Sequence, residues 1–114
     1  MLPEEAKLLI DMRDAARKIT HMLGSQPFDL LPDEDPVRDA VYWNFTIIGE
    51  ACAQLRKINE SLTDRITESW RIIGFRNQVV HGYGKINHAI TARIIDEKLP
   101  ILLAELDELL RGVG

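Results

Sequence analysis

An arginine, a histidine and a tyrosine lie within eight residues of one another, in the segment Arg-Asn-Gln-Val-Val-His-Gly-Tyr that runs from Arg76 to Tyr83. A histidine exchanges protons near neutral pH, an arginine holds a phosphate with a planar fork of donors, and a tyrosine offers a hydroxyl that can be modified. Residues 65–93 carry five basic side chains against the single acid Glu68, although the whole chain has a net charge of −4. This combination points to a phosphodiester as the target.

Length and composition predict one folded domain. The chain has 114 residues, of which 46% are hydrophobic and 28% charged, which is typical of a globular protein with a single core. We expect residues 1–114 to form one domain of a cytosolic protein, because acids interrupt the apolar positions near the N-terminus and no apolar run approaches the ~18 residues of a membrane span. The one cysteine, Cys52, lies in an apolar helical pattern that predicts a buried side chain.

Apolar residues recur at helical spacing along the whole chain, and we see no strand pattern. This pattern predicts an all-α fold, an antiparallel bundle of about four to five helices. We expect a first helix over 4–23 that ends at Gly24, followed by a loop over 24–35 with one short turn. A second helix should begin where Asp35 caps it before Pro36. A third helix should cover 66–81 and end at Gly82 and Gly84, and Asn87 should cap a fourth that Pro100 kinks or splits.

Gly49 and the third helix both indicate close packing. Glycine inside a helix costs roughly 1 kcal/mol relative to alanine, so a close helix crossing or a subunit contact would explain Gly49. On the third helix, Ile73 and Val80 widen the apolar arc beyond what one bundle easily buries. We therefore expect this face to form the two-fold interface of a homodimer.

Arg76 and His81 are five residues apart, or about 140° around an ideal helix. Their side chains meet only through the length of the arginine, a frayed helix end or a second subunit. Asn77 lies four residues before His81 and on the same face. The spacing favours a composite site, in which a two-fold axis brings two copies of Arg76 and His81 together.

The pattern Arg76-Asn77-x-x-x-His81-x-Tyr83 resembles that of the HEPN superfamily, and specifically of its HepT-like toxins. The resemblance extends from the first helix to the last. It includes further elements in the same order along the chain, which are Ile48-Gly49-Glu50-Ala51, Trp70-Arg71-x-Ile73 and Leu99-Pro100.

The resemblance implies a metal-independent endoribonuclease, the toxin of a type II toxin–antitoxin pair, that acts as a homodimer with its active site in the cleft between protomers. It implies catalytic roles for Arg76 and His81 and a supporting role for Asn77. It also implies an RNA substrate and a partner antitoxin, a minimal nucleotidyltransferase of the MntA type, that silences the toxin by transferring AMP to Tyr83. No cofactor is expected.

RNA itself supplies the nucleophile for such a reaction. Its 2′-hydroxyl attacks the adjacent phosphate when a base removes its proton and an acid protonates the leaving 5′-oxygen, which gives a 2′,3′-cyclic phosphate. His81 suits either proton transfer, worth about 10²–10⁴-fold in rate, and Arg76 would stabilise the phosphorane by about 3 kcal/mol. We expect no metal site, because His21, His81 and His88 show no ligand spacing with the carboxylates.

Each assignment has a structural alternative. A histidine at a helix end is often a dipole partner, Arg76 could be an interface salt-bridge residue, and Tyr83 a packed aromatic. Glu50 is either solvated or paired with Arg76, and we expect the pair. His88 and Arg93 are candidates for outer RNA contacts. The alternative function is a non-catalytic helical module that binds nucleotide or regulates a nucleotidyltransferase.

Overall fold

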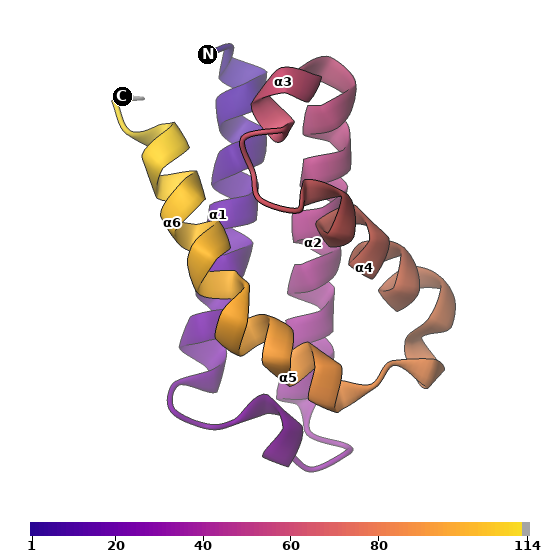
Figure 1. Cartoon of the computed structure of the whole chain (residues 1–114). Helices are drawn as coiled ribbons and strands as arrows, with labels where there is room; N and C mark the ends of the chain where they lie inside the picture. The colour runs from indigo at the N-terminus through magenta and orange to yellow at the C-terminus, as the bar shows by residue number, and fades with distance from the viewer. Residues whose placement is uncertain (113–114) are drawn as a thin grey trace.

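The computed structural model describes residues 1–112, which form an all-α fold (Figure 1). These residues contain no strand. None of their helices combines the length and the apolar composition that a membrane span requires. The helices are α1 (Pro3–Leu23), α2 (Pro36–Ile58), α3 (Glu60–Thr63), α4 (Ser69–Gly82), α5 (His88–Glu97) and α6 (Leu99–Leu110), with 3₁₀ turns at Phe28–Leu30 and Tyr83–Lys85.

The two long helices α1 and α2 run antiparallel and carry the centre of the core (Figure 1). α6 packs against α1, and α4 packs against α2. Apolar side chains at helical spacing line the facing sides, so that Leu9 and Ile19 of α1 and Ile48 and Leu55 of α2 are almost wholly buried. α4 therefore lies on the outside of the hairpin, with one face on α2.

Helix ends that depend on local capping lie where the sequence predicts them. Asp35 caps α2 by accepting a hydrogen bond from the Val37 amide at 2.9 Å, and Asn87 caps α5 by accepting one from the Ala89 amide at 2.9 Å. Gly24 follows α1 with a positive φ of 57°, a conformation that glycine adopts readily. These three predictions are confirmed.

Other boundaries differ from the prediction. α4 begins at Ser69 rather than at 66, because Glu68 before it has a left-handed φ of 53°. The polar stretch over 60–65 contains the single turn α3, and Pro100 splits the fourth predicted helix into α5 and α6. α4 ends at Gly82, as predicted, and Gly82 has an extended φ of −141°. The described residues thus hold six α-helices instead of four to five.

Cys52 is buried in α2, as predicted. Its thiol donates a weak hydrogen bond to the carbonyl oxygen of Ser69 at 3.9 Å. Burial raises the pKa of Cys52 to about 11, so the side chain is a protonated packing residue between α2 and α4.

Candidate functional site

α2 and α4 cross in close contact where Gly49 faces Arg76. A Cβ atom on Gly49 would lie 2.2 Å from the Arg76 Cβ and 3.2 Å from the carbonyl oxygen of Ile72. Real Cβ atoms essentially never approach other atoms to within 3.0 Å, so this crossing requires glycine. The close helix crossing, one of the two explanations expected from the sequence, accounts for Gly49 and sets the position of the Arg76 backbone.

We predict that Gly49→Ala lowers the free energy of unfolding by about 1–3 kcal/mol, because the added methyl group forces the two helices apart. Gly74→Ala is the matched control within α4, since nothing lies within 4 Å of a Cβ there. That change should stabilise the protein by up to about 1 kcal/mol through helix propensity. Urea denaturation of both variants checks the pair, and a Gly49→Ala variant as stable as Gly74→Ala would contradict the crossing.

Arg76 is held at this crossing by Glu50. Its Nη1 donates to Glu50 Oε2 at 2.7 Å, and its side chain is 22% exposed. In the described part of the chain, Nε is buried and has no hydrogen-bond partner. Nη2 also has no partner, but it is not buried. The expected pair with Glu50 is confirmed within one chain, and Nη2 is the nitrogen that remains available to an anion.

Asn77 and His81 lie on the exposed side of the last turns of α4. Within residues 1–112 neither side chain has a hydrogen bond or an ion pair, and nothing joins His81 to Arg76. Val80 beside them is 54% exposed. Ile73 instead packs partly against the core, so the apolar surface expected for a second subunit is narrower than predicted, and the two-fold interface stays a prediction.

Tyr83 directly follows α4 and lies against α2. Its hydroxyl donates to Asp39 Oδ1, and its ring meets Tyr42 edge-on with ring centroids 5.4 Å apart. Partial burial, and then the hydrogen bond and charge of Asp39, raise the pKa of Tyr83 to about 12. The side chain remains 44% exposed. Tyr83 is therefore a packed aromatic whose other edge reaches solvent.

Behind Tyr83, a polar network joins α2 to α5. The Tyr42 hydroxyl lies 2.7 Å from His88 Nδ1 and 2.9 Å from Thr91 Oγ1. Burial raises the pKa of Tyr42 and lowers the pKa of His88. His88 is thus engaged inside the fold through Nδ1, and Nε2 is its one ring nitrogen left for the outer RNA contact considered above.

Arg38 is a buried cation that anchors the acidic loop before α2. Its side chain is almost wholly covered, its guanidinium lies 5.1 Å from the Phe28 ring centroid, and its Nη2 donates to the carbonyl oxygen of Leu31. Two further guanidinium nitrogens have no partner in the described residues. The sequence did not single out Arg38, since its main polar partner is a backbone carbonyl that no side-chain pattern reveals.

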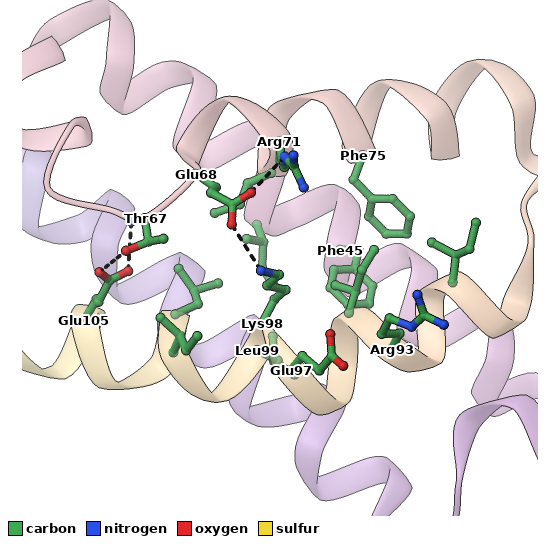
Figure 2. Close-up of a pocket in the computed structure, with 16 residues that line it drawn as sticks. Phe45, Thr67, Glu68, Arg71, Phe75, Arg93, Glu97, Lys98, Leu99 and Glu105 are labelled. Atoms are coloured by element: carbon green, nitrogen blue, oxygen red, sulfur yellow. Dashed lines mark hydrogen bonds and ion pairs between the residues drawn. The ribbon is translucent and has the colours of Figure 1, made fainter.

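An apolar groove of about 300 Å³ lies between α4 and the α5–α6 segment. Figure 2 shows Phe75 beside it and Glu68 bridging Arg71 and Lys98 at its rim, at 2.8 and 3.1 Å. Arg93 of α5 also lines it. The groove lining does not include Arg76, Asn77, His81 or Tyr83. The groove and the predicted catalytic residues are therefore separate features.

A comparison with protein families identifies the family of this chain. The family model HepT-like, described as Ribonuclease HepT-like, matches residues 12–109. The matched span contains most of α1 and all of α2 to α5, and with them Gly49, Glu50 and the whole motif over 76–83. A search of curated proteins and a search of solved structures found no match.

Proposed function

The chain belongs to the HepT-like ribonuclease family, and from that membership we propose that it is an endoribonuclease and the toxin of a toxin–antitoxin pair. The observation that carries the proposal is the family match over residues 12–109. It spans all of α4, on which Arg76, Asn77 and His81 lie at or near the surface. RNA is the substrate that this membership implies.

The proposed reaction is a metal-independent transesterification. The 2′-oxygen forms a bond to the adjacent phosphorus, the bond to the 5′-oxygen breaks, and a 2′,3′-cyclic phosphate results. One proton leaves the 2′-hydroxyl and another joins the 5′-oxygen, and His81 carries one of these transfers. Arg76 stabilises the added negative charge of the phosphorane, while its pair with Glu50 fixes the guanidinium and leaves Nη2 for the phosphate. Asn77 orients the phosphate or His81.

We propose a composite site in a homodimer. Arg76 is paired with Glu50 of α2, whereas His81 lies on the exposed side of α4. No hydrogen bond joins His81 to Arg76 in the described residues. A two-fold axis beside Val80 would bring Arg76 of one protomer next to the partner's His81. Exposed apolar side chains on the same two helices, Trp43 of α2 and Trp70 and Val80 of α4, support an interface there.

We further propose that a minimal nucleotidyltransferase silences the toxin by transferring AMP to Tyr83. The partly exposed Tyr83 side chain directly after α4 supports this assignment, because another enzyme can reach it without unfolding the core. The modified residue would then lie two positions from His81.

Expression in a bacterial host tests the proposed function. The chain alone should arrest growth, and the purified protein should cleave RNA. Arg76→Ala should do neither, because loss of the phosphate contact should lower kcat by about 10²–10³-fold. Co-expression with a nucleotidyltransferase encoded beside it should restore growth and add the mass of one or more AMP groups to the peptide that contains Tyr83. Unimpaired growth together with no RNA cleavage would overturn the proposal and favour the non-catalytic helical module.

A further inference from the structure

One polar contact ties the end of α4 to the start of α2. The Tyr83 hydroxyl donates to Asp39 Oδ1, and Asp39 lies in the first turn of α2. The Tyr83 ring rests edge-on against the buried ring of Tyr42. Among the described residues, no other side chain between His81 and Lys85 forms a hydrogen bond. Tyr83 therefore provides the side-chain hydrogen bond that fixes this segment, and Ile86 after it packs partly against the core.

The same contact bears on the position of His81. Val79 is the last side chain of α4 that the core buries, and His81 follows two residues later with no partner in the described part of the chain. Regular helix geometry ends at Gly82. The last turn of α4 is thus held by Val79 on one side and by Tyr83 on the other.

We infer that Asp39 is a positioning residue for RNA cleavage, which holds the Tyr83 hydroxyl and thereby keeps His81 in place. This inference rests on the proposed function. Asp39 needs no contact with RNA for this role, because it acts through the backbone that carries His81. A misplacement of about 1 Å at a catalytic group can lower the rate by on the order of 10²-fold.

Transfer of a nucleotidyl group to Tyr83 would break the hydrogen bond between Tyr83 and Asp39. The transfer forms a bond between the Tyr83 oxygen and the α-phosphorus of ATP, breaks the bond to pyrophosphate and releases the phenol proton to solvent. The modified oxygen has no hydrogen to donate, and its phosphodiester anion repels the Asp39 carboxylate. Modification therefore releases Tyr83 from α2 and displaces His81, without the nucleotide having to fill the phosphate site.

Ionisation of Tyr83 provides a signature of the contact in solution. Burial raises the pKa of Tyr83 most, Asp39 and then Tyr42 raise it further, and Arg38 lowers it. Asp39→Asn removes the neighbouring negative charge, so the pKa of Tyr83 should fall from about 12 toward its ordinary value of 10.0. Ultraviolet absorbance of tyrosinate measures this step. Tyr83→Phe assigns it, because Tyr42 is the one other tyrosine.

The kinetic test compares Asp39→Ala, Asp39→Asn, Tyr83→Phe and the double variant Asp39→Ala/Tyr83→Phe on an RNA oligonucleotide. Asp39→Ala and Tyr83→Phe should each lower kcat by about 10–100-fold with little change in KM, and the double variant should be no slower than either. Asp39→Asn keeps an oxygen that accepts the hydrogen bond, so it should retain most of kcat. Hydrogen–deuterium exchange over 79–85 should rise in the alanine and phenylalanine variants alone.

Wild-type kcat and wild-type exchange in Asp39→Ala would overturn the inference. It would also be overturned if Asp39→Asn lost as much activity as Asp39→Ala, because the charge rather than the hydrogen bond would then matter. Failure of the proposed function looks different, since the wild-type chain would cleave no RNA. In that case the exchange and tyrosinate measurements still decide whether Asp39 holds the end of α4.

Discussion

Replacing His81 with alanine should abolish RNA cleavage and leave the fold intact. His81 is exposed and has no hydrogen bond or ion pair in the described residues, so the free energy of unfolding should change by no more than about 0.5 kcal/mol. Loss of its proton transfer should lower kcat by about 10²–10⁴-fold. Initial rates on a labelled RNA oligonucleotide, with thermal unfolding of the same samples, measure the two effects separately.

His21→Ala is the matched control for this prediction. His21 is also an exposed histidine in the last turn of a helix, and it has no place in the proposed site. His21→Ala should therefore cleave RNA at the wild-type rate, and EDTA should not slow the wild type. Full activity in His81→Ala would refute the histidine assignment, and inhibition by EDTA would refute the metal-independent mechanism.

Helix boundaries could be predicted where their causes lie within a few residues. Asp35 and Asn87 cap their helices with side chains that reach amides two or three residues ahead, so the sequence alone predicts both starts. The start of α4 could not be predicted in this way. Glu68 there pairs with Arg71 on one side and with Lys98, thirty residues later, on the other. The left-handed conformation of Glu68 thus accompanies an ion pair to a residue distant in sequence, which no local pattern reveals.

The same distinction applies to the candidate site. Gly49 is anomalous inside a helix, so its sequence context predicted a close contact, and the neighbouring Glu50 was correctly paired with Arg76. The contact between Tyr83 and Asp39 joins residues 44 positions apart. In sequence Asp39 is an ordinary acid in the first turn of a helix. Only the fold identifies it as the acceptor for Tyr83.

Val80→Asp should prevent formation of the proposed homodimer and remove RNA cleavage with it. Val80 is 54% exposed in one chain, so the aspartate remains solvated in a monomer and the fold should tolerate it. In the proposed interface the same carboxylate would be buried without a partner, at a cost of about 3–5 kcal/mol. Association should then weaken by more than about 100-fold, and a site composed of two protomers cannot form.

Ile90→Asp provides the comparison that separates the interface from a general effect of added charge. Ile90 is 55% exposed and lines the groove between α4 and α5, away from the proposed two-fold axis. Its aspartate variant should remain dimeric in sedimentation velocity at micromolar concentration and should cleave RNA at the wild-type rate. A wild-type monomer at that concentration, or a monomeric Val80→Asp variant with full activity, would show that one chain carries the complete site and that Arg76 and His81 act without a second subunit.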